Sequence, residues 1–272
     1  MFLVVPQWQG SGSSRSMRLV DGATAIAGDL PASSTTMIEV PLEAGDERGT
    51  GVARCGSLLL VRERMHRQLA LAKEPVITIG GDCGVDLAAI EHVLHEDVAV
   101  VWLDAHPDLN TPESSPSGAF HGMVLRTLIG DGHADLTPAV PLSPGRVVLA
   151  GVRAADVAED DYIEEAGIRR LGVEQLGAER GADALVAAIE ATGATSVYLH
   201  IDLDVIDPAE FAGLGYPEPF GLAPSVLVDL VKAVKRRFRM VGAAITEFAP
   251  ASPEDAAEDL PTVLRVIGAL NG

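Results

Sequence analysis

The sequence has few cysteines and a small share of basic residues. It contains two cysteines in 272 residues and no CxxC pair, so a disulfide framework is not indicated and a reducing compartment is the simpler expectation. Lysine and arginine together number 20, against 39 aspartates and glutamates, which gives a formal net charge of −19. A charge of this sign repels nucleic acids and anionic lipid surfaces, so neither is expected as a partner.

Long apolar runs and internal repeats are also missing from the sequence. The opening run MFLVV spans five residues without a basic leader, which is too short for a signal peptide or a membrane span, so we expect a cytoplasmic protein. No GxGxxG motif opens the first strand–helix unit, which argues against a dinucleotide-binding domain. Hydrophobic residues make up 47% of the chain, enough for a substantial core, and we expect a single domain over residues 1–272.

Short apolar runs alternate with longer stretches of helical periodicity. The helical stretches at residues 57–74, 223–238 and 255–270 each have a polar outer face, and Ser57 is a candidate N-cap of the first. This alternation is typical of strand–helix units around a parallel sheet and predicts a three-layer α/β/α domain. The candidate strands are Phe2–Val5, Met37–Val40, Val76–Ile79, Val98–Leu103, Val147–Leu149, Val197–Ile201 and Val241–Ile245.

Carboxylates and an imidazole come directly after two of the apolar runs. Asp104, His106 and Asp108 follow Leu103 at a spacing of two, which would point all three to one side of an extended backbone. Asp202 and Asp204 follow a second run at the same spacing. Ligands of such sheets bind beyond the carboxyl ends of the strands, so we expect these five side chains to converge there. The carboxylates would repel one another without a cation, whereas divalent ions make the same cluster a stable site.

The residue types in this cluster favour manganese. Carboxylate-rich ligation with one or two imidazoles suits Mn²⁺ or another divalent ion of similar hardness better than a structural zinc ion, which prefers Cys and His. The cluster offers more ligands than one ion needs, which suggests two ions bridged by shared carboxylates. Two ions in turn imply an activated water.

Cys83, in the stretch VITIGGDCG, is a further candidate ligand. Gly80 and Gly81 permit a tight turn between strand and helix and place the thiol near a helix N-terminus. That position predicts a lowered pKa of the thiol, and a nearby divalent ion would deprotonate it outright. The alternative is a small cysteine buried in the core.

These residues together resemble the arginase family of ureohydrolases, also called the arginase and agmatinase family. The matching stretches occur in the family's order: GGDC at 80–83, DAHPDLN at 104–110, SGAFHG at 117–122, GVRAADVAE at 151–159, IDLDVIDP at 201–208 and TEFAP at 246–250. The resemblance implies a parallel, eight-stranded sheet between layers of helices and a cluster of two manganese ions at the edge of the sheet.

The resemblance also assigns the ligands of the two ions. Asp104 and Asp202 would bridge the ions, Asp108 would complete the ligands of the first, and His106 with Asp204 those of the second. The family normally has histidine where this sequence has Cys83. A thiolate can still complete the site, but it is softer, so divalent ions other than manganese stay open.

Three residues are implied in the chemistry. Asp108, beside the activated water, would carry a proton; Glu247 would hold the guanidinium; and His121 would be the general acid and base. Outside its motif, His121 would be interpreted as a surface loop residue.

Substrate recognition is implied for residues matched to those that hold the α-carboxylate and α-amino group of arginine. These are Asn110, Ser117, Asp156 and Glu159, although the first two also suit turns and the last two a helix N-terminus. Two departures from arginases occur nearby. Ala119 replaces an asparagine that contacts the carboxylate, and Tyr216 stands where arginases usually have threonine near the guanidinium.

The sequence therefore predicts a binuclear metallohydrolase that cleaves the guanidino group of L-arginine or a close derivative such as Nω-hydroxy-L-arginine. The products would be ornithine and urea or a substituted urea. The alternatives are an agmatinase or another guanidino-acid hydrolase, and a non-catalytic relative that binds metal or ligand. Family precedent includes monomers, trimers and hexamers, so a homo-oligomer is one of the options.

Overall fold

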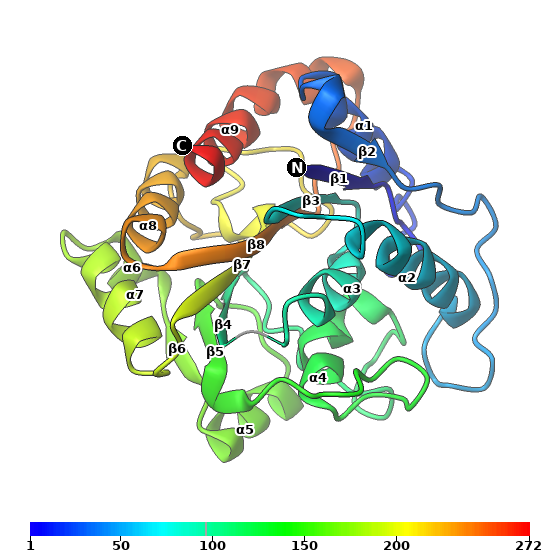
Figure 1. The fold of residues 1–272 in the computed structure, drawn as a ribbon, viewed down its shortest axis with the longest axis horizontal. Coiled ribbons are helices and arrows are strands. Elements are labelled where there is room, and N and C mark those ends of the chain that lie inside the picture. The colour runs from blue at the N-terminus through cyan, green and yellow to red at the C-terminus, as the bar shows by residue number, and fades with distance from the viewer. Residues whose placement is uncertain (96) are drawn as a thin grey trace.

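The computed structural model describes residues 1–95 and 97–272. Within them, eight strands form one sheet in which all neighbours are parallel, in the order β2-β1-β3-β8-β7-β4-β5-β6 (Figure 1). The strands are β1 Phe2–Val5, β2 Thr35–Met37, β3 Val76–Gly80, β4 Val98–Leu103, β5 Val147–Ala150, β6 Arg169–Leu171, β7 Ser196–Asp202 and β8 Arg239–Thr246. The predicted eight-stranded α/β sandwich is confirmed.

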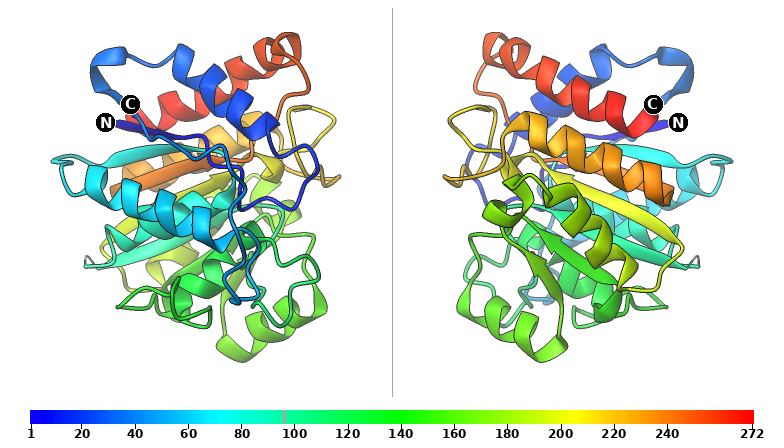
Figure 2. Two further views of the ribbon diagram at one scale, coloured as in Figure 1. Left: turned by 90° about the vertical axis from the view of Figure 1, so that its right-hand side faces the viewer. Right: turned by 90° about the vertical axis from the view of Figure 1, so that its left-hand side faces the viewer.

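Helices cover both faces of the sheet (Figures 1 and 2). One face packs against α1 Arg18–Gly28, α6 Val173–Gly177, α7 Gly181–Glu190, α8 Pro224–Arg237 and α9 Pro253–Asn271. The other face packs against α2 Cys55–Leu69, α3 Asp86–Glu91, α4 Val124–Ile129 and α5 Val157–Ala166. Among the described residues, no helix combines the length and the apolar character that crossing a bilayer requires.

The two cores meet the central strands from opposite sides. On β4, Val101 and Leu103 point into the core under α7 and α8, while Val100 and Trp102 point into the core under α3 and α4. Because both faces of β4 are covered, all of its residues are buried and apolar. This pattern explains why the sequence shows β4 as an unbroken apolar run.

The edges of the sheet differ from the sequence-based expectation. The predicted strand Met37–Val40 is shifted, because Thr35, Thr36 and Met37 pair with β1 instead. Strand β6 was not predicted, since it is only three residues long and begins with two arginines. The predicted cap at Ser57 is also wrong: α2 begins at Cys55, after Arg54 in a left-handed conformation with φ of 58°.

Candidate metal centre

The candidate ligands lie at the carboxyl ends of the four central strands. Cys83 follows β3 in a short 3₁₀ helix, Cys83–Val85, and Asp104 follows β4. Asp202 ends β7, and Glu247 directly follows β8. Because β3, β8, β7 and β4 are neighbours in the sheet, residues that are far apart in the sequence meet at one edge.

The structure brings the six predicted ligands, together with His200 and Glu247, into three overlapping groups, each with its ligand atoms within 4.8 Å of one another. The groups are Cys83, Asp104, Asp108 and His200; Cys83, Asp202 and Glu247; and Asp104, His106 and Asp204. Asp104 belongs to two groups, as the predicted bridging carboxylate would. Asp202 Oδ2 lies 3.1 Å from the sulfur of Cys83, the residue that the first two groups share. These positions support the ligand assignment, which stays a prediction.

The loops after β4 and β7 share the same local turn. The backbone N–H of His106 donates to Asp104 Oδ1 at 2.6 Å, and that of Asp204 donates to Asp202 Oδ1 at 2.8 Å. The predicted extended backbone through Asp108 is wrong, because β4 ends at Leu103 and Asp108 has a left-handed φ of 53°. A turn, and not the period of a strand, therefore aims these side chains at the site.

Glu247 shares this unusual backbone, with a φ of 62°. Its backbone N–H donates to the carbonyl of Gly81 at 2.8 Å, which ties the end of β8 to the turn before Cys83. Non-glycine residues in this region cost on the order of 1–3 kcal/mol and cluster at binding and active sites. Asp108 and Glu247 are therefore positioned at a conformational cost.

The buried carboxylates change one another's ionisation. Burial and the charge of Asp104 raise the pKa of Asp204 to about 6, and the same two causes raise the pKa of Asp108 well above the ordinary value. Burial and the charges of Asp204 and Asp104 do the same for Asp202. Burial opposes ionisation of His106 as well, but hydrogen bonds to Asp104 and Asp204 raise its pKa. The cluster therefore holds more negative charge than the surrounding protein balances.

Cys83 departs from the expectation for a thiol near a helix N-terminus. Its pKa is raised well above the ordinary value, because the side chain is buried and faces Asp202, Asp108 and Glu247. The predicted lowering of this pKa is wrong for the chain by itself. A divalent ion would supply the positive charge that converts the thiol to a thiolate ligand.

Two unpaired oxygens point to a cation at this position. Asp108 Oδ2 and Glu247 Oε2 are buried, and neither has a hydrogen-bond partner among the described residues. An unsatisfied buried acceptor costs about 1–3 kcal/mol, more when it is charged. Oxygen-rich groups with one thiol fit divalent ions of hard to intermediate character. The residues present therefore fit a pair of metal ions.

A cavity of about 360 Å³ opens onto the cluster. All five predicted substrate residues line it: Asn110, Ser117, Asp156, Glu159 and Tyr216. His121 also lines the cavity. Its Nδ1 lies 3.4 Å from Glu247 Oε1, and the centroid of its ring lies 5.0 Å from that of the Tyr216 ring. Burial would lower the pKa of His121, but the hydrogen bond to Glu247 raises it.

Two of these lining residues also have structural contacts. Glu159 accepts the backbone N–H of Leu109 with one oxygen and that of Asp156 with the other, both at 2.8 Å. Asp156 precedes α5, and its Oδ2 accepts from Asn110 Nδ2 at 2.9 Å. The alternative reading of Asp156 and Glu159 as a helix N-terminus is thus confirmed, and their role toward substrate stays a prediction.

Sequence reasoning missed residues that support the cluster from behind. Arg153, in the GVR stretch, donates through Nη2 to the carbonyls of Asp204 and Glu218, each at 2.7 Å. Asp82, in the GGDC stretch, accepts from Gly10 N at 2.9 Å, and burial and Glu247 raise its pKa to about 6. Both lie inside quoted motifs, so motif position was the signal. His200 had no such signal, because a histidine within an apolar run is usually a core residue.

The fold and the site define a hydrolase of the metal-dependent α/β class, with a carboxylate cluster at the edge of a parallel sheet. Comparison with known proteins narrows this class. The family model described as "Arginase family" matches residues 19–264. The chain is 32% identical to an arginase of Entamoeba histolytica over 206 residues, which is 72% of this chain and 69% of the relative. It is 34% identical to the arginase of Bacillus caldovelox over 211 residues, 72% of this chain and 67% of the relative.

A solved structure agrees with the sequence matches. The crystal structure of Entamoeba histolytica arginase in complex with L-ornithine superimposes with a TM-score of 0.88 and 26% identity, covering 100% of this chain and 97% of the other. The chain therefore belongs to the arginase family. Its members are metal-dependent hydrolases with two metal ions, and the chain is a hydrolase acting on carbon–nitrogen bonds of linear amidines.

Proposed function

We propose that this protein hydrolyses the guanidino group of L-arginine or a close derivative such as Nω-hydroxy-L-arginine. The products are ornithine and urea or a substituted urea. The two metal ions are manganese, and the protein works in the cytoplasm as a single domain. Both cysteines are free thiols, which supports a reducing compartment.

The observation that carries this proposal is the polarity of the cavity. One end is formed by the carboxylates of the cluster and by Glu247, which suits a positively charged guanidinium. The other end carries Asn110, Ser117 and Asp156, which suit the amino and carboxylate groups of an amino acid. A linear molecule with a cation at one end and an α-amino acid at the other matches both.

The reaction divides among the residues of the acidic end. Two divalent ions there would supply the Lewis acidity that makes water a nucleophile at neutral pH. Glu247, whose Oε2 is unpartnered among the described residues, binds the guanidinium and fixes its plane. His121, 3.4 Å from Glu247, gives a proton to the departing amine, and Asp108 carries the proton taken from water.

The bound product of a relative supports the choice of substrate. The Entamoeba histolytica arginase structure contains L-ornithine, the amino acid that remains after urea leaves arginine. In this chain, Asp156 would receive the α-amino group of such a molecule. Asp156 Oδ2 already accepts from Asn110, which holds the carboxylate in position.

Ala119 favours a second candidate, an agmatinase or a hydrolase of another guanidino acid. It lines the cavity with a methyl group where the family's asparagine would contact the substrate carboxylate. A lost hydrogen bond to a charged group weakens binding by about 1.5–3 kcal/mol. Agmatine has no carboxylate, so it would not suffer this loss.

Release of urea, or of hydroxyurea from Nω-hydroxy-arginine, is measured for a panel of guanidino compounds to test the proposal. Arginine, Nω-hydroxy-arginine, agmatine and guanidinobutyrate are compared with manganese-loaded protein, and we expect turnover of the first two. Asp156→Asn should raise KM for arginine and leave KM for agmatine unchanged if agmatine is turned over at all. Turnover of agmatine without arginine overturns the substrate assignment.

A non-catalytic relative is separated from an enzyme by the same assay. Metal content and turnover are measured for Cys83→His and Cys83→Ser. A catalytic thiolate site responds to both changes. Metal binding without turnover of any compound would instead identify a binding protein.

A further inference from the structure

His200 is a fully buried imidazole directly behind the metal cluster. It lies on β7, two residues before Asp202, so both side chains leave the same face of the strand. It pairs across the sheet with Trp102 of β4, and the two rings stack with centroids 3.5 Å apart and planes 14° apart. The ring of His200 is therefore held in one orientation.

The partners of His200 determine which of its nitrogens carries a proton. Nδ1 lies 2.7 Å from Asp86 Oδ2, and the other oxygen of Asp86 accepts the hydroxyl of Tyr198 at 2.6 Å. A carboxylate that already accepts from a phenol is an acceptor for Nδ1 as well, so Nδ1 is the donor. A neutral imidazole that donates from Nδ1 directs the lone pair of Nε2 forward.

Nε2 of His200 faces Asp104 and the other candidate ligands of the first group. It is buried and has no hydrogen-bond partner among the described residues. Its distance to Asp104 Oδ2 is 3.5 Å, and that oxygen already accepts from Trp102 Nε1 at 3.0 Å. Nε2 of His200 and Asp104 belong to the same group of candidate ligand atoms, so a cation held by this group would be shared between them.

The ligand atoms of the first group are close enough to hold one ion. Those of Cys83, Asp104, Asp108 and His200 lie within 4.8 Å of one another. The resemblance to the family predicts an imidazole at position 83, where this chain has a thiol. His200 supplies an imidazole to the same group from the neighbouring part of the sheet.

We propose that Nε2 of His200 is a ligand of the metal ion held by Cys83, Asp104 and Asp108, and that Asp86 orients it. The carboxylate–histidine pair behind a metal fixes both the tautomer and the ring orientation. Tyr198 in turn holds Asp86, and Thr78 beside it belongs to the same buried layer. This inference rests on the metal site of the proposed function and is independent of its substrate.

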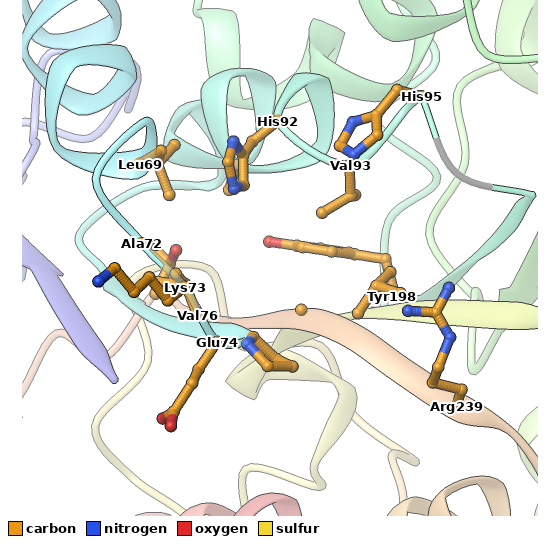
Figure 3. Close-up of a pocket in the computed structure, with 15 residues that line it drawn as sticks. Leu69, Ala72, Lys73, Glu74, Val76, His92, Val93, His95, Tyr198 and Arg239 are labelled. Atoms are coloured by element: carbon orange, nitrogen blue, oxygen red, sulfur yellow. The ribbon is translucent and has the colours of Figure 1, made fainter.

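Tyr198 connects this arrangement to a second cavity. The cavity has a volume of about 210 Å³ and lies at the amino end of β3 and β8, where Tyr198 forms part of its wall (Figure 3). Figure 3 shows the phenol ring extending beneath His92 and Val93, the two residues that directly follow α3. Tyr198→Phe would leave the ring in place and remove only the hydroxyl that donates to Asp86. This substitution therefore removes one hydrogen bond to Asp86 without opening a large space.

Nuclear magnetic resonance with cadmium tests the proposal in the unmodified protein. The chain is labelled with ¹⁵N-histidine and loaded with ¹¹³Cd²⁺, and one-bond coupling between nitrogen and cadmium is recorded. We expect coupling at two histidines, His106 and His200, with the His200 coupling at Nε2. Coupling at His106 without coupling at His200 would show that His200 only contacts Asp104, and the proposal would fail.

Variants identify the signal and measure the contribution of each partner. His200→Gln should remove one coupled imidazole and weaken one of the two cation sites by at least a hundredfold in calorimetry. Asp86→Asn should weaken the same site by about 10–100-fold, and Tyr198→Phe by less. Equal cadmium affinity in His200→Gln and the unmodified protein would overturn the proposal.

The test separates this inference from the proposed function. Coupling at His200 in a protein that releases neither urea nor hydroxyurea from any guanidino compound would sustain the ligand and refute the activity. Urea release together with no coupling at His200 would do the reverse. Failure to take up cadmium or manganese would overturn both.

Discussion

Gly81 offers a direct test of how the motif around Cys83 is held. A methyl group at this position would lie 1.7 Å from the carbonyl oxygen of Gln7 and 2.7 Å from its carbon. Both atoms are backbone, so the segment after β1 would have to move. The same segment accepts the backbone N–H of Asp82 at 2.9 Å through Gln7, and it accepts the N–H of His121 at 3.0 Å through Gly10. The movement would therefore reach His121 and the candidate metal centre.

The cost of Gly81→Ala follows from these contacts. Overpacking costs about 1–3 kcal/mol, and the loss of one buried hydrogen bond adds about 1 kcal/mol. A total of about 3 kcal/mol corresponds to a fall in Tm of roughly 6–12 °C for a chain of this size. Thermal unfolding followed by the fluorescence of the buried Trp102 would measure it.

Two other glycines serve as controls for this substitution. A methyl group at Gly80 would meet the methyl groups of Thr246 and Val85 at 2.9 Å and the backbone oxygen of Ile245 at an ordinary 3.4 Å, so Gly80→Ala should cost less than Gly81→Ala. Gly268 is an exposed residue inside α9, and among the described residues no atom outside the backbone of its own helix lies within 4 Å of an added methyl group, so Gly268→Ala should leave Tm unchanged or slightly raised. If Gly81→Ala melted within about 2 °C of the unmodified protein, the reasoning from backbone contact would be wrong.

Three further outcomes are expected. Glu159→Gln should lower the free energy of unfolding by about 1–3 kcal/mol in urea titrations, because its amide would face a backbone N–H; a raised KM at unchanged stability would contradict this. Arg153→Met should weaken cation binding about tenfold in calorimetry, since it releases the carbonyls of Asp204 and Glu218, and unchanged affinity would refute the role. The pKa of Asp204 is raised to about 6 in the folded protein, so protonation of Asp204 stabilises the fold at low pH. This stabilisation is lost as the pH rises through 6. The gain in Tm on adding Mn²⁺ should therefore be larger at about pH 8 than at about pH 5, and equal gains in paired scans would contradict the shift.

The central strands and the motifs after them were predictable because their signals are local. In β4 and β7 every residue is buried, so each strand is a short apolar run even where a single polar residue interrupts it. The polar residues that follow are adjacent in sequence. A parallel sheet then brings adjacent strand ends together without further information.

The layer behind the cluster was not predictable for the opposite reason. The orientation of His200 depends on its contacts with Asp86 and Trp102, which lie on other elements and belong to no motif. The raised pKa of Cys83 depends on carboxylates that only the folded chain places around it. Strand β6 was missed because pairing with β5, and not hydrophobicity, defines it.

The charge of the site connects the metal ligands to the choice of substrate. If Cys83, Glu247 and the four aspartates Asp104, Asp108, Asp202 and Asp204 are all ionised, they carry six negative charges, and two divalent ions return four. Two negative charges then remain at this end of the cavity when the neighbouring imidazoles are neutral. With a neutral histidine at position 83, one negative charge would remain. A thiolate ligand at position 83 would therefore weaken the Lewis acidity of its ion and strengthen the attraction for a cationic guanidinium, so we expect tighter substrate binding and a less activated water than with histidine at this position.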